Sequence, residues 1–125
     1  MGLLRTFSAL CVFALPWFWF SIAGGHVFLV AAEPGAGSVL KGSPPHIRIW
    51  FDGALKPAAC VIHVENGEGQ RVDRDDSRVS PKDPRLLEAS LPLLPSGKYR
   101  VIWHVKAADG HQAEGDFFFT IQAGD

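Results

Sequence analysis

The residues best suited to chemistry in this sequence are Asp109 and His111, which stand on either side of Gly110. Side chains two residues apart point to the same side of an extended backbone. A glycine between them permits a bend that brings the carboxylate and the imidazole toward one point. The same residues are also common turn residues, because Asp-Gly pairs favour turns. The motif alone therefore leaves two interpretations open, a functional site or a plain turn.

The segments around this motif predict two β-strands joined by a loop. The first segment alternates, with one face predicted to point inward and the other outward. The inward set is Tyr99, Val101, Trp103 and Val105, and the outward set is Arg100, Ile102, His104 and Lys106. After the loop, the inward period continues at Phe117, Phe119 and Ile121. We expect Tyr99 and Trp103 to pack in the core and His104 to face solvent.

Further short strands are expected upstream, with turn residues between them. They cover residues 26–32, 38–40, 46–51, 59–65 and 86–91, of which the last also fits one helical turn. No segment has the pattern of an amphipathic helix. About seven short strands at near-regular spacing predict an all-β fold, an antiparallel β-sandwich or Greek-key barrel. In such a fold, loops that are distant in sequence meet at the two ends.

Composition narrows the classes of function. The 125 residues suffice for one domain, and the net charge of -1 gives no reason to expect a nucleic-acid partner. The sequence lacks a Gly-x-Ser-x-Gly elbow, a His-Glu-x-x-His motif and a phosphate-binding glycine loop. We therefore do not expect a hydrolytic enzyme, and the leading hypothesis is a protein without catalytic activity.

Residues 1–25 have the pattern of a secretory signal peptide. Arg5 precedes an apolar run from Thr6 to Ile22, and small residues follow it. A retained membrane anchor is the alternative, because the run approaches spanning length. Cleavage is compatible with two positions, after Ala23 or after Gly25, and the second makes His26 the first residue of the mature chain. The domain would then cover residues 26–125.

Signal cleavage would remove Cys11 and leave Cys60 as the one remaining cysteine. An exported chain with a single cysteine has no internal disulfide, so its stability must come from core packing. Because Cys60 stands among apolar residues, we expect it to be a small buried hydrophobic side chain.

The sequence resembles the CopC family of periplasmic copper-binding proteins over essentially the whole mature chain. The similar segments are HVFLVAAEPGAGSVL directly after the signal peptide, SPPHIRIWF, and GKYRVIWHVKAADGHQAEGDFFFTI. The last segment matches the family's Gly-x-Tyr-x-Val-x-Trp, Asp-x-His and aromatic-strand pattern. The resemblance implies a small Ig-like β-sandwich that handles copper in copper resistance or homeostasis, and a CopD-type inner-membrane importer as a partner.

The resemblance also implies a ligand set for Cu(II). It consists of the free amino group and imidazole of His26, together with Asp109 and His111. Cu(II) prefers nitrogen and oxygen donors in a tetragonal arrangement, and this set provides three nitrogens and one oxygen. An N-terminal histidine supplies two of them through one chelate ring. Because an α-amine titrates near pH ~8, copper must displace a proton and binding should weaken in acid.

The sequence departs from the family pattern in three places. Its only methionine is Met1, so a thioether Cu(I) site, which some members carry, is not available. Phe51-Asp52-Gly53 stands where the family often has Phe-Ser-Glu, which removes a glutamate that could tune the metal from a neighbouring position. Asp52 is a possible substitute for that glutamate. Ala108 stands where serine is frequent.

Three alternatives remain open at this stage. An N-terminal histidine is also the core of histidine-brace copper enzymes, so an oxidative enzyme is one, and ascorbate-driven oxygen consumption would reveal it. A metal-free Ig-like binding module is another, favoured if cleavage follows Ala23. The last is a second metal site built from two of His46, His63 and His104.

Overall fold

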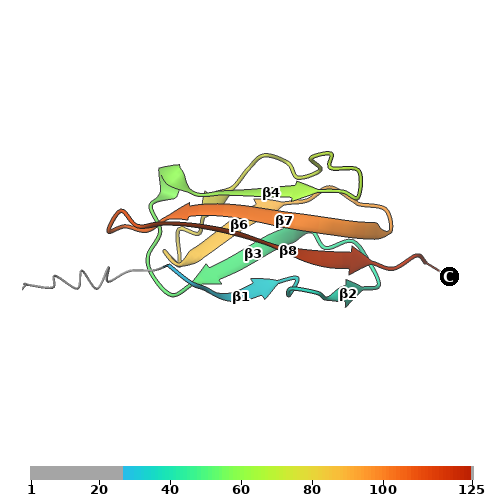
Figure 1. Cartoon of the computed structure of the whole chain (residues 1–125), viewed down its shortest axis with the longest axis horizontal. Helices are drawn as coiled ribbons and strands as arrows, with labels where there is room; N and C mark the ends of the chain where they lie inside the picture. The colour runs from blue at the N-terminus through green and yellow to red at the C-terminus, as the bar shows by residue number, and fades with distance from the viewer. Residues whose placement is uncertain (1–26, 125) are drawn as a thin grey trace, which may run out of the picture.

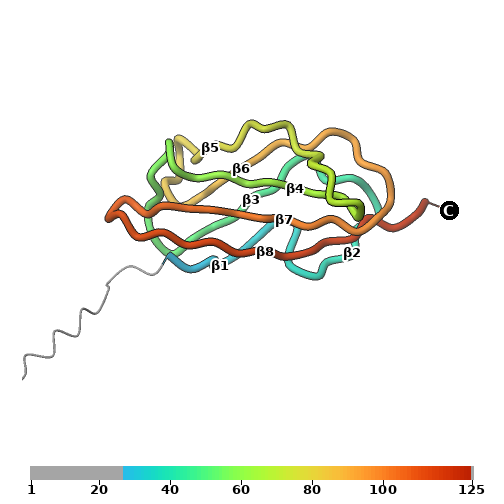
Figure 2. The backbone as a smooth tube through the Cα atoms, turned by 45° about the horizontal axis from the view of Figure 1, so that its top comes forward, coloured from blue at the N-terminus to red at the C-terminus, as the bar shows by residue number. Residues whose placement is uncertain are grey.

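Two four-stranded β-sheets packed as a sandwich make up the computed structural model, which describes residues 27–124 (Figures 1 and 2). The first sheet has the order β1 (Leu29–Glu33), β3 (His46–Phe51), β6 (Leu86–Ser90) and β5 (Arg78–Val79). The second has the order β2 (Val39–Leu40), β8 (Gln112–Ile121), β7 (Gly97–Lys106) and β4 (Val61–Glu65). The prediction of an all-β sandwich is confirmed.

The strand pairing departs from the expected pattern in one place. Strand β2 runs parallel to β8, through Val39↔Thr120 and Leu40↔Ile121, whereas the other strand pairs are antiparallel. A short 3₁₀ helix, η1 (Pro57–Ala59), precedes β4 and delays its expected start. Proline favours the first turn of a helix because its φ is already fixed there. Within residues 27–124, no helix has the length and hydrophobicity needed to span a bilayer.

The hairpin formed by β7 and β8 is the longest pairing in the described chain. Its register runs without interruption from Gly97↔Ile121 to Lys106↔Gln112. The predicted alternation is confirmed, because Tyr99, Val101, Trp103 and Val105 are buried and His104 is exposed. Period-two patterning therefore decides which face of this sheet packs inward.

The core lies between the two sheets and is aliphatic and aromatic. Its most fully buried large side chains are Phe51, Phe119, Ile47, Ile49, Ile62, Leu87, Val64 and Val101. The Phe51 and Trp103 rings meet edge to face across the sandwich, with centroids 5.2 Å apart. Cys60 joins this core as a buried free thiol, in agreement with its predicted role.

Apart from the start of β1, the predicted strands lie within about two residues of the observed ones, but β5 (Arg78–Val79) forms where the sequence predicted no strand. Residues 86–91 adopt the strand interpretation, as β6, and residues 46–51 form β3 as expected. Strand β1 begins at Leu29, not at His26, which lies outside the described residues. Before β1, the Phe28 amide donates a hydrogen bond to a side chain, Asp52 Oδ1, at 2.8 Å.

Gly115 on β8 leaves the space that the Trp103 ring occupies. A Cβ added at Gly115 would lie 2.5 Å from Cζ2 of Trp103, and this ring is buried in the core. We predict that Gly115→Ala lowers the free energy of unfolding by about 1–3 kcal/mol, as overpacking does in other cores. Gly42→Ala is the matched control, because a Cβ there meets nothing within 4 Å. Urea denaturation of both variants measures the effect, and equal stability would contradict the packing assignment.

Candidate metal site

One end of the sandwich gathers the segments that carry the predicted chemistry. Strands β3 and β7 end there, and β1 and β8 begin there (Figures 1 and 2). The loop with Asp109 and His111 joins β7 to β8 at this end. Antiparallel connections therefore bring residues of the N-terminal segment and of the C-terminal hairpin to the same end.

The Asp109–His111 loop is a tight turn closed by backbone hydrogen bonds. The Gly110 amide donates to the Ala107 carbonyl at 2.9 Å, and the Ala107 amide donates to the His111 carbonyl at 2.7 Å. Gly110 has a φ of 96°, a conformation that disfavours residues with a Cβ. The glycine therefore supports the bend that was predicted between the two candidate ligands.

Asp109 and His111 direct their polar atoms to one another. Oδ1 of Asp109 accepts a hydrogen bond from the His111 amide at 3.1 Å, and Nδ1 of His111 also lies 3.1 Å from this oxygen. Nδ1 is shielded from solvent and has no hydrogen bond of acceptable geometry. Two donors on neighbouring corners around one ion, with bonds of about 2 Å, lie about 3 Å apart. This pair therefore fits the donor spacing that a divalent ion requires.

The pKa of the Asp109 carboxyl is lowered from its ordinary value. The backbone amide of His111 is the main cause, and the nearby imidazole adds to the effect. Both favour the ionised carboxylate. A carboxyl group must be deprotonated to bind a metal ion, and the lowered pKa favours this form of Asp109.

A short segment, residues 52–56, connects this loop to the start of the described chain. The Ala108 amide donates to the Ala54 carbonyl at 2.9 Å, and the Lys56 amide donates to the Lys106 carbonyl at 2.8 Å. At the other end of this segment, Asp52 Oδ1 accepts a hydrogen bond from the Phe28 amide. A hollow of about 300 Å³ lies between these parts. Its lining consists of Val27, Asp52, Gly53, Ala54, Ala107, Ala108 and Asp109.

The described residues supply only part of the predicted ligand set. Between residues 27 and 124, no group of three or more His, Cys, Asp or Glu side chains is arranged to hold a metal ion. Asp109 and His111 form a pair, and His26 lies outside the described residues. A complete site would need further donors in addition to this pair.

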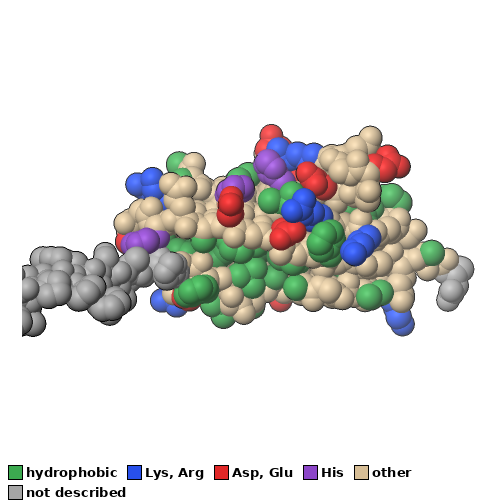
Figure 3. All heavy atoms as spheres, viewed as in Figure 1, with side chains coloured by type: hydrophobic (Ala, Val, Ile, Leu, Met, Phe, Trp, Pro, Cys, Tyr) green, Lys and Arg blue, Asp and Glu red, His purple; other side chains and the backbone are tan. Residues whose placement is uncertain are grey.

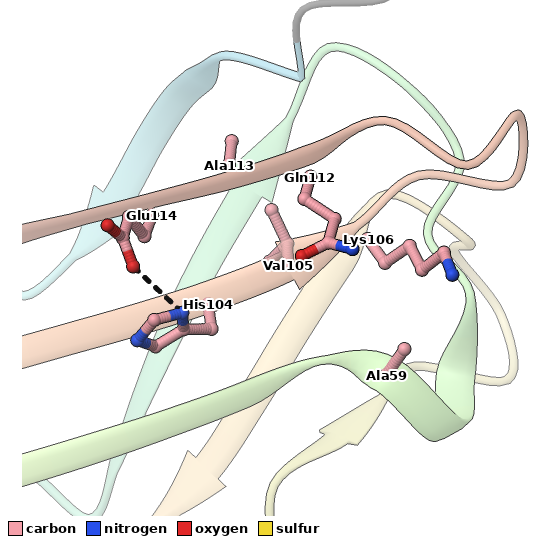
Figure 4. A pocket seen from close by; sticks show the side chains of 7 residues that line it. All are labelled: Ala59, His104, Val105, Lys106, Gln112, Ala113 and Glu114. Carbon is pink, nitrogen blue, oxygen red and sulfur yellow. Dashed lines mark ion pairs between the residues drawn. The ribbon is translucent and has the colours of Figure 1, made fainter.

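The other histidines do not assemble such a group either. His104 on β7 lies 3.1 Å from Glu114 on β8, and the two side chains point toward one another beside a hollow of about 500 Å³ (Figure 4). Histidine and acidic side chains appear over β7 and β4 in Figure 3, while hydrophobic side chains gather over β8 and β1. His104 and Glu114 are both largely exposed, so we interpret them as a surface pair.

The contact between Asp52 and Phe28 could not be predicted from the sequence. From its position, Asp52 is a possible substitute for a missing glutamate, and no sequence pattern links it to a distant backbone amide. The one available signal was an Asp-Gly turn directly after a clear strand, since Asp side chains often bond to nearby backbone in such turns.

These observations define a small Ig-like β-sandwich with a candidate Asp–His metal site at one end. The CopC domain family matches residues 29–122, and the chain therefore belongs to the CopC family. The copper transport protein CutJ of Bacillus subtilis (strain 168) is 32% identical over 101 residues. That match covers 80% of this chain but 19% of CutJ, so the chain spans about a fifth of this relative's length.

Solved structures of the family show the same fold. CopC from Methylosinus trichosporium OB3b matches with a TM-score of 0.75 and 32% identity, over 80% of this chain and 97% of that one. PcoC, a methionine-rich copper resistance protein from Escherichia coli, matches with a TM-score of 0.65 and 25% identity, over 78% and 100% of the two chains. The family resemblance stated from the sequence is confirmed.

The geometry of the loop predicts how Asp109 titrates in the metal-free protein. We expect its pKa to lie below the ordinary value of about 3.9, and His111→Ala to retain part of this lowering, because the backbone amide remains. The stabilisation from this hydrogen bond is present above the ordinary pKa and is lost as the pH falls through the lowered one. Carboxyl ¹³C NMR across an acid titration measures it. An ordinary pKa for Asp109 would contradict the geometry.

Proposed function

We propose that residues 26–125 form a periplasmic Cu(II)-binding protein that binds and delivers copper through His26, Asp109 and His111. The observation that carries the proposal is the solvent-shielded Nδ1 of His111. It has no well-aligned hydrogen bond and lies 3.1 Å from an Asp109 carboxylate oxygen. Imidazole and carboxylate groups are both common ligands of transition-metal ions, so an ion bound beside these two atoms would be coordinated by both. Family membership makes copper the expected ion.

The start of the described chain supports a contribution from His26. Val27 is buried in the core and shares the hollow beside Asp109. Consecutive Cα atoms are only about 3.8 Å apart. The amine and imidazole of a residue bonded to Val27 therefore have only a short distance to cover to reach Asp109. Together with Asp109 and His111 they would supply the nitrogen-rich set that Cu(II) prefers.

The oxidation state that we propose follows from the available donors. PcoC is described as methionine-rich, and thioethers are ligands for Cu(I). The only methionine of this sequence is Met1, so residues 26–125 contain none. Imidazole, amine and carboxylate donors favour Cu(II) instead.

The cellular setting is part of the same proposal. Residues 1–25 would act as a signal peptide, with cleavage after Gly25 placing the free amine on His26. The mature protein would handle copper in the periplasm for resistance or homeostasis and pass it to a CopD-type inner-membrane importer. Support for a transporter partner comes from CutJ, named as a copper transport protein, in which the similar segment belongs to a much longer chain.

The proposed chemistry is ligand exchange without catalysis. Asp109 would supply negative charge, and the two histidines would supply neutral nitrogen donors once their protons are displaced. Three nitrogens and one carboxylate would occupy the equatorial positions of a tetragonal ion and leave little room for oxygen or an organic substrate. Copper would leave when a partner offers competing ligands.

Substitution of the loop ligands tests the proposal. We expect the chain beginning at His26 to bind a single tight equivalent of Cu(II), measured by competition with a chromophoric chelator. His111→Ala and Asp109→Ala should each weaken binding by more than about 100-fold, beyond the loss typical of residues that only support a ligand. His104→Ala is the matched control, because His104 also lies 3.1 Å from a carboxylate but on the outer face of the sheet. Wild-type affinity in the loop variants would refute the proposed site.

A further inference from the structure

We infer that Asp52 is a positioning residue that holds the N-terminal copper-binding segment against the Asp109–His111 loop. This inference rests on the proposed function and adds a residue to it. Asp52 does not reach the metal in this scheme. It acts on the backbone that follows His26.

The contact between Asp52 and Phe28 is reciprocal. The Phe28 amide donates to Asp52 Oδ1 at 2.8 Å, and the Asp52 amide donates to the Phe28 carbonyl at 3.0 Å. The first hydrogen bond involves a carboxylate, and charge-assisted bonds of this kind are stronger than neutral ones. The contact therefore fixes the Phe28 amide just before β1 begins and the Asp52 amide just after β3 ends.

The position of Asp52 links this contact to the candidate site. Asp52 and Asp109 line the same hollow, together with Val27. Two residues beyond Asp52, the Ala54 carbonyl accepts a hydrogen bond from the Ala108 amide, next to Asp109. Residues 52–54 therefore contact the N-terminal segment on one side and the loop on the other, at the end of the sandwich where both lie (Figure 1).

We call the pair of hydrogen bonds between Asp52 and Phe28 the clamp. It matters because the N-terminal end of a chain otherwise frays. Fixing a residue costs about 1–2 kcal/mol of conformational entropy, and this cost is subtracted from binding if the ligand must impose the order. A clamp in the metal-free protein meets that cost in advance. Val27 is buried in the core, which fixes the chain directly before Phe28. Asp52 anchors the backbone amide of the following residue.

Substitutions at Asp52 separate position from charge. Asp52→Ala removes the acceptor oxygen, whereas Asp52→Asn keeps an acceptor oxygen and removes the charge. We expect Asp52→Ala to weaken Cu(II) binding by about 10–100-fold, the range observed when residues that support metal ligands are removed. Asp52→Asn should stay within a few-fold of the wild type.

A readout without copper tests the clamp itself. In the metal-free protein, the Phe28 amide should exchange with deuterium at least about tenfold faster in Asp52→Ala than in the wild type or in Asp52→Asn. Asp76→Ala is the matched control, because Asp76 Oδ1 also accepts a backbone hydrogen bond, from the Ser90 amide at 2.7 Å. Ser90 pairs with His46 at the opposite end of β3, so this variant should change neither Phe28 exchange nor copper affinity.

The outcomes distinguish this inference from the proposed function. Wild-type affinity in Asp52→Ala, or unchanged Phe28 exchange, overturns the positioning role and leaves the proposed site standing. Equal weakening by Asp52→Ala and Asp52→Asn assigns the effect to charge and also overturns it. If Asp109→Ala and His111→Ala retain tight binding, the proposed function fails, and the inference fails with it.

Discussion

The uninterrupted backbone pairing of β7 with β8 is the constraint on which the rest of the molecule depends. Its register fixes which side chains of both strands face the core, and Tyr99, Val101 and Trp103 are buried as a result. The same register leaves Ala107–His111 as the connection between the strands. The candidate ligands therefore sit on a turn whose ends are held by a long ladder, and a site built on rigid elements holds its geometry more closely than one on a free loop.

A second set of contacts, made by residues 52–56, brings the N-terminal segment to this loop. Asp52 bonds to Phe28, and the Ala54 carbonyl accepts from Ala108, so one segment contacts two parts of the chain far apart in sequence. In the proposed site, His26 supplies two donors, its amine and its imidazole, and the Asp109–His111 loop supplies the others. The affinity would then depend on how well the metal-free protein already orders the N-terminal segment. If the metal must order this segment, the free energy that this requires is subtracted from the free energy of binding.

Much of the fold follows from the sequence because alternation is a strong signal where one strand face is buried. Residues 46–51 and 97–106 show it, and both strands appear as expected. The parallel pairing of β2 and the 3₁₀ helix at Pro57–Ala59 were missed, since tertiary contacts decide such short segments. The bend at Gly110 could be predicted from residue type. The clamp by Asp52 could not, because a side chain that bonds to a distant backbone amide leaves no periodic pattern. The predicted ligand set of His26, Asp109 and His111 stays a prediction.

The most direct measurement of the proposed site is electron paramagnetic resonance of Cu(II) added to two forms of the protein, one beginning at His26 and one with Gly25 still attached. The added glycine moves the free amine away from His26 and leaves every described residue unchanged. We predict a tetragonal, nitrogen-rich spectrum with a single tight equivalent for the first form, and loss of that spectrum for the second. Identical spectra and affinities for the two forms would show that the amine of His26 is not a ligand, and would contradict the central proposal.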